Sequence, residues 1–551
     1  MNDHPFEALS LLPPIIAIVL AILTRRAVLS LLLGIFVGAL VTNRWQAVHA
    51  AYDFFEVHLW PTLTDPGKLR VFAFTLLMGA MVGVISRSGG MHGLIEKISP
   101  FARTRRGGQL TTWLLGWVIF FDDYANTILL GSTLRPLADR LRISREKLAY
   151  LVDSTAAPIA GLALLSTWVA VEIDYIGDGL EQVDGGAGVN AMSLFVDSIP
   201  YRFYVLGALL FVPIVALMGR EFGPMLRAEQ MSAQGQRSAG TLDDDVAEGD
   251  KIDPDKARWY NAAIPIGVTL AIVMWLLYTT GKQSLGADLA AGDLGLRDIL
   301  GAADSSLSLQ YGALAGLVTA GLLCMTQRIL DFPGVITAAG KGARVVLPAL
   351  AILWCASALS RLTGNKSVDG QQSAEAFDFD DHRLYTGDYL AALIMPTDVE
   401  DPQESVTIKL LPTMIFVLAG VLAFSTGTSF GTMGILMPMV IGFIGPVVSS
   451  TGEFDAAHPI LLAAVASVLA GAVFGDHCSP ISDTTILSSQ ACACDHMAHV
   501  VTQMPYAVSV GTVAIVFGTL PVGWGVSVWI LLPVQVAVLI AMLRVLGTRV
   551  E

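Results

Sequence analysis

The sequence predicts an all-α polytopic membrane protein, built as an inverted repeat with about 11 spans, two re-entrant hairpins and two broken helices. Three observations carry this prediction: the apolar composition, the distribution of basic residues among the loops, and a polar motif that occurs twice. Of the 551 residues, 54% are hydrophobic and only 15% are charged, and the mean hydropathy is +0.63. Soluble domains typically carry about 25% charged residues, so this composition is typical of a membrane protein.

Each span needs about 20 mostly apolar residues. In chain order, the segments that meet this requirement are 6–24, 27–43, 71–88, 147–171, 203–219, 259–280, 309–327, 344–361, 458–489 (interrupted), 504–521 and 525–543.

Composition also excludes several classes of protein. Residues 1–7 carry no Lys or Arg, and Arg25 and Arg26 follow the first span, which is the reverse of a signal peptide, so we expect no cleavage. Five scattered cysteines give no disulfide framework. A net charge of −14 argues against a nucleic-acid partner.

The basic residues predict the topology. With the N-terminus outside and the C-terminus cytoplasmic, most Lys and Arg fall in inside loops, as the positive-inside rule requires. Residues 172–200 contain six acids and no base, which favours an outside loop.

Two segments do not fit simple alternation. Residues 109–134 have basic residues on both flanks and the polar centre FFDDYANT, which predicts a re-entrant hairpin entered from the inside. Residues 406–447 contain FSTGTSFGT between acidic flanks, which predicts a second hairpin entered from the outside.

A repeated motif supports a duplication. Pro158-Ile159 is followed by Leu165-Ser166-Thr167, and Pro480-Ile481 is followed at the same spacing by Leu487-Ser488-Ser489. We therefore expect a first repeat at 1–224, a polar cytoplasmic linker at 225–258, and a second inverted repeat with a C-terminal helix at 259–551.

The polar breaks predict cation chemistry. Pro158 and Pro480 break the helical hydrogen-bond ladder and free backbone carbonyls inside the membrane. A buried carboxylate favours binding Na+ or H+, and competition between the two is the simplest route to exchange. The acidic candidates are Asp122, Asp123, Asp476 and Asp483. Candidate neutral oxygens come from Asn126, Thr127, Ser154, Thr155, Ser429, Thr432, Ser479, Thr484 and Thr485.

Other interpretations of these residues remain open. Hydroxyls in membrane helices often bond to their own backbone or join helices. Because Asp122 and Asp123 are adjacent, one of them is expected to be structural. His477 could carry a proton, sense pH or be packed. A zinc site is a weaker alternative, and its spacing matches no usual pattern. Its candidate ligands are His477, Cys478, Cys492, Cys494, His496 and His499. We expect His496 and His499 at the inside membrane surface.

The segments FFDDYANTILLGSTLRPLADRL and GDHCSPISDTTILSSQACACDHMAHVVTQMPYA closely resemble the NhaC family of Na+/H+ antiporters, within the ion-transporter superfamily. This resemblance implies inverted repeats, hairpins facing broken helices, a homodimer in the cell inner membrane, and elevator-like alternating access. It implies one cation site at Asp122, Asp123, Asn126 and Thr127 with Ser154 and Thr155. It implies another at Thr428, Ser429 and Thr432 with Asp476, Ser479, Asp483 and Thr484.

The function expected from this resemblance is Na+/H+ antiport, with Na+ at Asp123, Asn126, Asp476 and Asp483. Na+ and H+ are then the coupling ions, and no cofactor is expected. The alternative is Na+-coupled transport of an amino acid or small carboxylate, since half-helix N-termini at FSTGTSFGT could hold a carboxylate. A channel or a structural protein is a further class. The sequence contains no GxxxxGK[ST] motif, which argues against a nucleotide-driven pump, and no hydrolytic motif that would predict an enzyme.

Overall fold

A computed structural model of the chain describes residues 4–24, 26–90, 92–93, 102–236, 258–285, 299, 303–364, 382–387, 389, 405–449 and 454–550. In these ranges the protein is almost entirely helical. The strands that they contain, β1 (Arg220–Glu221) and β2 (Thr548–Arg549), form an antiparallel pair with Arg220 opposite Arg549.

The helices of the first half are α1 (Leu12–Thr24), α2 (Ala27–Thr42), α3 (Ala47–Asp53), α4 (Trp60–Thr64), α5 (Pro66–Arg87), α7 (Arg105–Val118), α8 (Asp123–Arg140), α9 (Arg145–Ala160), α10 (Thr167–Leu180), α11 (Ala191–Ser198), α12 (Phe203–Met218) and α13 (Gly223–Ala233). Short 3₁₀ or π turns lie at Glu7–Leu11, Phe54–Leu59, Gly186–Gly188 and Ile199–Tyr201.

The helices of the second half are α14 (Tyr260–Leu285), α16 (Ser305–Thr326), α17 (Phe332–Val345), α18 (Leu347–Thr363), α20 (Val406–Thr426), α21 (Ser429–Ser449), α22 (Pro459–Cys478), α23 (Asp483–Ala491), α24 (His496–Ala514), α25 (Leu520–Gly523) and α26 (Val528–Leu546). A π turn at Ile515–Thr519 joins α24 to α25.

The all-α membrane fold is confirmed. Eight described helices are long and apolar enough to cross a bilayer, or up to ten if each of two bent pairs counts as one span. The expected spans at 6–24 and 27–43 are represented by α1 and α2, which have 13 and 16 residues. Because both are shorter than the roughly 20 residues that a straight span needs, the number 11 stays a prediction.

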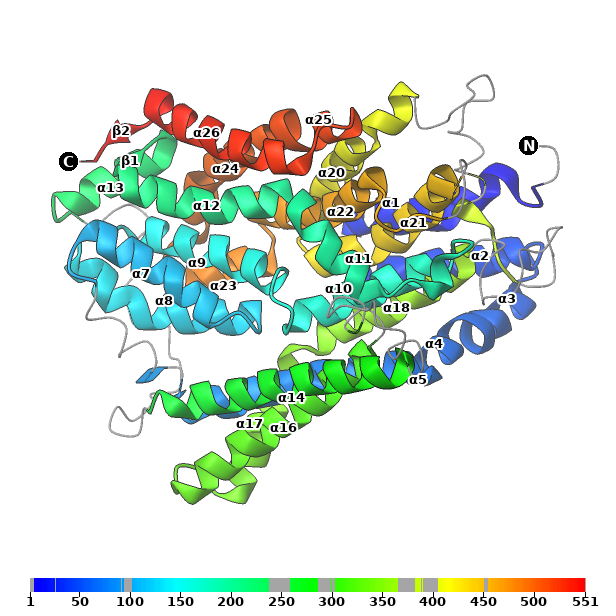
Figure 1. Cartoon of the computed structure of the whole chain (residues 1–551), viewed down its shortest axis with the longest axis horizontal. Coiled ribbons are helices and arrows are strands. Elements are labelled where there is room, and N and C mark those ends of the chain that lie inside the picture. Colours follow the sequence, from blue (N-terminus) through cyan, green and yellow to red (C-terminus); the bar gives the residue numbers. More distant parts are fainter. Residues whose placement is uncertain are drawn as a thin grey trace.

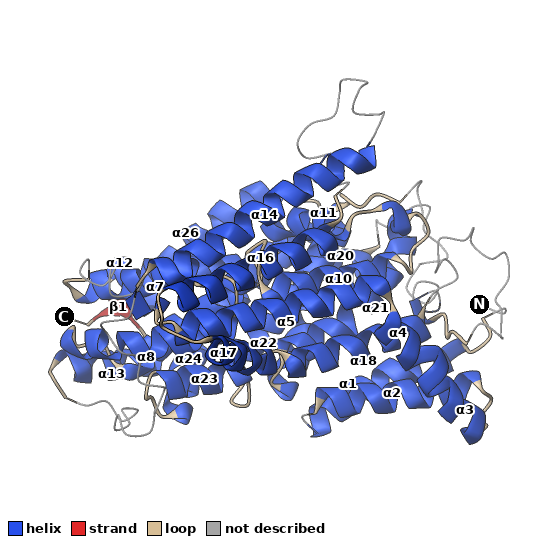
Figure 2. Cartoon of the chain, turned by 90° about the horizontal axis from the view of Figure 1, so that it is seen from below, coloured by secondary structure: helices blue, strands red, loops and turns tan. Residues whose placement is uncertain are grey.

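Most helices run along the long axis of the molecule, and the two termini lie at its opposite ends (Figures 1 and 2). In Figure 1, α5, α14, α16 and α17 form a layer below the main body. Helix α5 packs against α16 and α17 within this layer and contacts α10 of the main body. The sequence did not predict α17.

Both expected hairpins are helix–turn–helix units. Helices α7 and α8 turn at residues 119–122, and α20 and α21 turn at Gly427 and Thr428. With 14 residues, α7 is about 21 Å long and too short to cross a bilayer, in keeping with a re-entrant course. Helices α20 and α21 are each long enough to cross, so the re-entrant course of 406–447 stays a prediction.

Gly427 makes the second turn possible. Its φ of 68° is left-handed, and a Cβ atom there would lie 2.5 Å from the carbonyl oxygen of Ile481. The glycine therefore lets the hairpin turn lie directly against the second broken helix.

The two helix breaks differ from each other. Pro480 stands in the break between α22 and α23, as predicted. Pro158 lies inside α9, which continues to Ala160, so the break falls at residues 161–166 instead. A proline removes only its own N–H donor, and the helix here ends two residues later at the Gly161 C-cap.

The proposed loop at 172–200 is also corrected. Its first part continues α10 to Leu180, and α11 occupies Ala191–Ser198. Two of its acids, Asp174 and Asp178, form ion pairs with Lys68 and do not belong to a solvated loop. In the expected linker, residues 225–233 belong to α13, whereas 237–257 lie outside the described residues.

Candidate functional site

The hairpin turns and the broken helices meet inside the main body. Tyr124 after the first turn donates a hydrogen bond to Asp483 of the second broken helix. Ser429 after the second turn donates to Asp476 of that helix. Helices α8, α21 and α23 begin at these contacts, and α10 begins at Thr167, which donates to Asp122 in the first turn. Helix N-termini carry partial positive charge, which favours acidic side chains at such a meeting point.

In the first turn, the adjacent acids have different surroundings. Asp122 caps α8, since one carboxylate oxygen accepts from the backbone N–H of Ala125 at 2.8 Å and the other from the Thr167 hydroxyl at 3.1 Å. Asp123 is buried, and its Oδ2 has no hydrogen-bond partner among the described residues. Asp123, rather than Asp122, therefore has an oxygen free for an ion.

Asn126 holds the first turn together. Its side-chain amide donates to the carbonyls of Gly116 and Ile119 at the end of α7, each at 3.0 Å. This orientation leaves Asn126 Oδ1 buried, and neither this atom nor the Thr127 hydroxyl oxygen has a partner in the described part of the chain. Three oxygen atoms in one stretch of α8, including one from Asp123, are thus unsatisfied. Buried polar atoms normally find partners, so these three point to a missing ligand.

The second broken helix contributes two acids. Asp476 Oδ2 accepts from the backbone N–H of Ser429 at 3.1 Å as well as from its hydroxyl, while Oδ1 has no described partner. Asp483 lies at the start of α23 and accepts from Tyr124 across the site. The family resemblance grouped Asp483 with the cation site that faces the second hairpin, but its hydrogen-bond partner Tyr124 belongs to the first hairpin.

Most predicted hydroxyls are already engaged by the protein. Thr155 and Thr432 donate to carbonyls of their own helices, Leu151 at 2.7 Å and Thr428 at 3.1 Å. Ser479 donates to Phe424 O at 2.7 Å and joins the second break to the hairpin. The remaining predicted hydroxyls also lie near the breaks: Ser154 is buried on α9, Thr428 accepts from Gly431 N, Thr484 contacts Ser482, and Thr485 contacts Asp153 and the Asp476 carbonyl.

Asp153 is the acid that the sequence reasoning did not select. It is fully buried on α9, and its Oδ2 accepts from Gln503 at 2.5 Å and from Thr485 at 3.3 Å. Its other oxygen has no described partner. The sequence feature that could have identified Asp153 is its position as the one charged residue in the stretch LAYLVDSTAAP.

Together these residues form an acidic centre, which we define as Asp123, Asp153, Asp476 and Asp483. Tyr124, next to Asp123, bonds to Asp483, and Thr485 bonds to both Asp153 and the Asp476 carbonyl. Among the described residues, no Lys or Arg forms an ion pair with any of the four. Several buried carboxylates without a basic partner require protons or cations.

The histidines do not support the zinc alternative. His477 contacts the Tyr204 hydroxyl at 2.9 Å through Nδ1. In the described ranges, no three His, Cys, Asp or Glu side chains converge closely enough to hold a metal ion. His499 is fully buried rather than at the membrane surface, because α24 packs it against α23.

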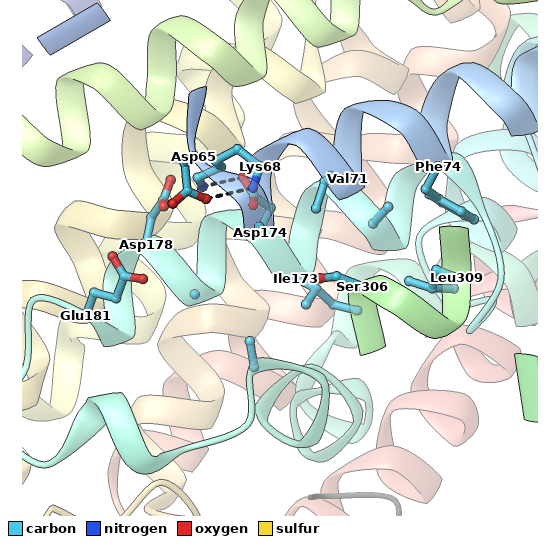
Figure 3. A pocket seen from close by; sticks show the side chains of 14 residues that line it. Asp65, Lys68, Val71, Phe74, Ile173, Asp174, Asp178, Glu181, Ser306 and Leu309 are labelled. Carbon is cyan, nitrogen blue, oxygen red and sulfur yellow. Dashed lines mark hydrogen bonds and ion pairs between the residues drawn. The ribbon is translucent and has the colours of Figure 1, made fainter. Parts of the chain in front are cut away.

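Two cavities lie beside the first hairpin and the α5–α10 contact. One, of about 530 Å³, lies between α5, α8 and α17 and is lined by Arg87, Lys341, Asp122 and Tyr124. The other, of about 200 Å³, contains Lys68 between Asp174 and Asp178, at 2.6 and 2.5 Å (Figure 3). In the second cavity the acids already have a cation, which distinguishes them from the acidic centre.

Comparison with known proteins decides the family. A model described as "Na+/H+ antiporter family" matches residues 159–368 and 403–524. The chain belongs to the Na+/H+ antiporter family. It is therefore a multi-pass membrane protein and a secondary transporter rather than an enzyme.

Relatives of this family member cover different parts of it. An uncharacterized protein of Haemophilus influenzae is 30% identical over 532 residues, which cover 95% of this chain and 92% of the relative. The malate-2H+/Na+-lactate antiporter of Bacillus subtilis is 35% identical over 116 residues, covering 21% and 22%. The YdaH transporter of Alcanivorax borkumensis has a similar structure, with a TM-score of 0.51 and 14% identity over 88% of this chain and 90% of that one. At that identity the structural likeness concerns the fold.

Proposed function

We propose that the chain exchanges Na+ for H+ at the acidic centre. The single observation behind this proposal is that Asp123, Asp153 and Asp476 are buried, with Asp483 half-buried beside them, and that no described Lys or Arg forms an ion pair with any of the four. Carboxylate and amide oxygens are hard ligands suited to Na+. We assign Na+ to two sites, one at Asp123 and Asn126 and the other at Asp476 and Asp483, so that neither site requires three acids to converge. Thr485 and Asp153 bond to each other, and we place them outside both sites.

Exchange follows from the cost of charge inside the membrane. A buried carboxylate is stable either with Na+ or with a proton, and the empty, charged state is costly. Binding of one ion therefore requires departure of the other. Alternate exposure of the centre to the two sides then completes a transport cycle, which we propose to be elevator-like, in a homodimer in the cell inner membrane.

Transport by purified protein in proteoliposomes tests this proposal. An imposed Na+ gradient should drive proton movement with no organic solute present. Asp476→Asn and Asp483→Asn should each reduce this flux at least 100-fold while the protein still inserts, and Asp123→Asn and Asn126→Ala are the matching changes in the first repeat. A neutralised ligand can no longer exchange Na+ for H+.

Asp304→Asn is the matched control, because Asp304 is an exposed cap of α16 far along the chain from the centre. This variant should transport like the wild type. Wild-type Na+ affinity in Asp476→Asn or Asp483→Asn would remove these residues from the assigned site.

A second candidate function is Na+-coupled transport of a small carboxylate or amino acid. The cavity of about 530 Å³ favours it, because Arg87 and Lys341 line it together with Tyr124 beside the centre. The name of the Bacillus subtilis relative also couples Na+ to a hydroxy acid. This function predicts proton flux only after malate, lactate or an amino acid is added, so counterflow of labelled solute separates the two functions.

A further inference from the structure

A second polar cluster, buried except for the half-buried His496, lies behind the acidic centre. It consists of His496 and His499 on α24, Ser489 on α23, and the Gln503 amide, and we call it the histidine cluster. The Ser489 hydroxyl oxygen lies 2.9 Å from His499 Nδ1 and 3.2 Å from His496 Nδ1. One hydroxyl therefore stands between two imidazole rings.

The Nε2 atom of each histidine ring lies next to a carbonyl or amide oxygen, which can only accept a hydrogen bond. His496 Nε2 lies 2.6 Å from the carbonyl oxygen of Pro480. His499 Nε2 lies 2.9 Å from Gln503 Oε1. The amide orientation of Gln503 is fixed, since its nitrogen donates to Asp153 at 2.5 Å and to the His477 carbonyl at 3.0 Å. Both Nε2 atoms must therefore carry hydrogens.

The two Nδ1 atoms then compete for the single hydrogen of the Ser489 hydroxyl. If both rings are neutral, both Nδ1 atoms are acceptors, and Ser489 can donate to only one of them. The other Nδ1 would face an oxygen lone pair. Ser489 also lies 2.6 Å from the Thr485 carbonyl, a third acceptor for the same hydrogen. The Ser488 hydroxyl also lies 3.4 Å from His499 Nδ1, but it donates to the Thr485 carbonyl at the shorter distance of 3.1 Å. The contacts are therefore best satisfied when one ring carries hydrogens on both nitrogens.

The surroundings of the cluster favour one positive charge. From α9, the Asp153 carboxylate lies 3.9 Å from His499 Nε2. The Pro480 carbonyl follows the C-terminus of α22, whose partial negative charge favours a cation. At the start of the first break, the carbonyl of Gly161 accepts from the Arg202 guanidinium at 2.5 Å. At both breaks, a side-chain nitrogen therefore donates to a backbone carbonyl that has no partner within a helix.

Other charged groups limit the cluster to one extra proton. Burial by itself disfavours an imidazolium ion, and two would repel each other across Ser489. The ring of His477, from α22, faces Tyr204. Arg135 and Arg145 donate to the carbonyls of Ala491 and Cys492 beyond Ser489, so they add positive charge on that side. Asp153 is the acid that balances a single imidazolium.

We propose that His496, His499 and Ser489 form a proton-binding site that holds one exchangeable proton and releases it when Na+ occupies the acidic centre. The proton resides on Nδ1 of either ring, and Ser489 donates to the other. This proposal rests on the proposed Na+/H+ exchange and adds a proton carrier distinct from the carboxylates that bind Na+.

The connection to the ion runs through Asp153. Thr485 contacts both Asp153 Oδ2 at 3.3 Å and the Asp476 carbonyl at 3.2 Å. Na+ bound beside Asp476 would offset the negative charge of Asp153 that stabilises the imidazolium. This effect is large because Coulomb interactions are strong in a poorly solvated interior. The proton would then leave Nδ1 for water on the side to which the centre is exposed, and both rings would be neutral, with the Ser489 hydroxyl donating to one Nδ1.

Solid-state NMR of the full chain in lipid vesicles, labelled with ¹⁵N-histidine, tests the site. Near neutral pH, with N-methylglucamine as the only added cation, we expect one imidazolium signal. It should be lost in both His496→Gln and His499→Gln. Ser489→Ala should abolish it, whereas Ser488→Ala should retain it, because the Ser488 hydroxyl lies farther from His499, at 3.4 Å. Adding Na+ should reduce the wild-type signal.

Neutral spectra for both rings in wild-type protein without Na+ would overturn the proposal, and so would a signal unaffected by Ser489→Ala or by Na+ in protein that exchanges Na+ for H+. If a variant fails to fold, the wild-type spectra with and without Na+ still test the proposal. An intact imidazolium signal in protein without Na+-dependent proton flux would instead contradict the proposed function alone.

Discussion

At the scale of single residues, the hydrogen bonds show which candidate side chains have an oxygen atom without a partner. The sequence alone could not distinguish them. Asp122 and Asp123 are adjacent acids, yet one caps a helix with both carboxylate oxygens and the other keeps an oxygen free. The two amide atoms of Asn126 differ in the same way. Its nitrogen donates to two carbonyls of the turn, whereas its oxygen has no hydrogen-bond partner among the described residues. The predicted residue types were informative, but their roles depend on which atoms the fold satisfies.

Tyr124 gives a residue-scale prediction. Its hydroxyl donates to Asp483 and stabilises the charged carboxylate that we assign to Na+. Tyr124→Phe should raise the Na+ concentration for half-maximal transport about tenfold, because a hydrogen bond to a charged group contributes roughly 1.5 kcal/mol or more. Na+-dependent flux in proteoliposomes measures the change.

Tyr311→Phe is its control, since Tyr311 is half exposed on α16. That variant should keep the wild-type Na+ dependence. If Tyr124→Phe also kept it, the contact with Asp483 would have no role in ion binding.

At the scale of elements, glycines determine how closely helices approach. A Cβ atom at Gly342 of α17 would lie 2.1 Å from the Gly79 carbonyl of α5. At Gly83 of α5 it would lie 2.4 Å from the Ala338 carbonyl of α17. Small residues allow this backbone contact between membrane helices, which explains how the amphipathic α17 packs into the layer although it is no apolar span.

Gly342→Ala should therefore destabilise the protein by about 1–3 kcal/mol through overpacking. Gly340→Ala is a matched control two residues away, because a Cβ there would meet no atom within 4 Å. Thermal unfolding in detergent should show a lower melting temperature for Gly342→Ala alone. Equal melting temperatures for the two variants would show that α5 and α17 do not pack this closely.

Ion pairs distinguish the supporting elements from the site. Arg202 and Glu172 form a fully buried pair at 2.9 Å beside the first break. Lys147 pairs with Glu221 at 2.9 Å near β1, and Lys68 joins α5 to α10. Each of these buried acids pairs with a Lys or Arg, whereas none of the acids of the acidic centre pairs with a described Lys or Arg. That contrast, rather than acidity alone, identifies the centre.

At the scale of the whole molecule, the strand pair and the long axis of the helices bear on topology. The C-terminal strand β2 pairs with β1, which directly precedes α13 and the linker, so the C-terminus lies at the same end of the molecule as the start of the linker. The N-terminus lies at the other end (Figure 1). Since most helices follow this axis, we expect the termini on opposite sides of the membrane.

Site-directed labelling checks this topology. A membrane-impermeant maleimide should label Ala8→Cys in intact cells and Thr548→Cys only after permeabilisation, because we expect the N-terminus outside and the C-terminus cytoplasmic. The five native cysteines are buried and give a low background, which the wild-type protein controls. Labelling of both variants from one side would contradict an odd number of crossings.

The sequence by itself determined the membrane class, the family resemblance, most helix positions and the two polar hairpin turns. These features depend on local composition, on stretches of about 20 apolar residues and on proline and glycine positions, which are readable along the chain. It also selected Asp123, Asp476 and Asp483, because acids inside apolar segments are rare, and Asn126 as a neutral oxygen donor beside them.

Only the tertiary structure decided which of these groups meet. It placed Asp483 against Tyr124 of the first hairpin, added Asp153 to the centre, moved the first break beyond Pro158, and buried His499 beside Ser489. The first two outcomes depend on contacts between residues 359 and 332 positions apart. The other two depend on where the Gly161 cap ends α9 and on how α24 packs against α23. Neither composition nor spacing encodes them, because both describe the chain one segment at a time.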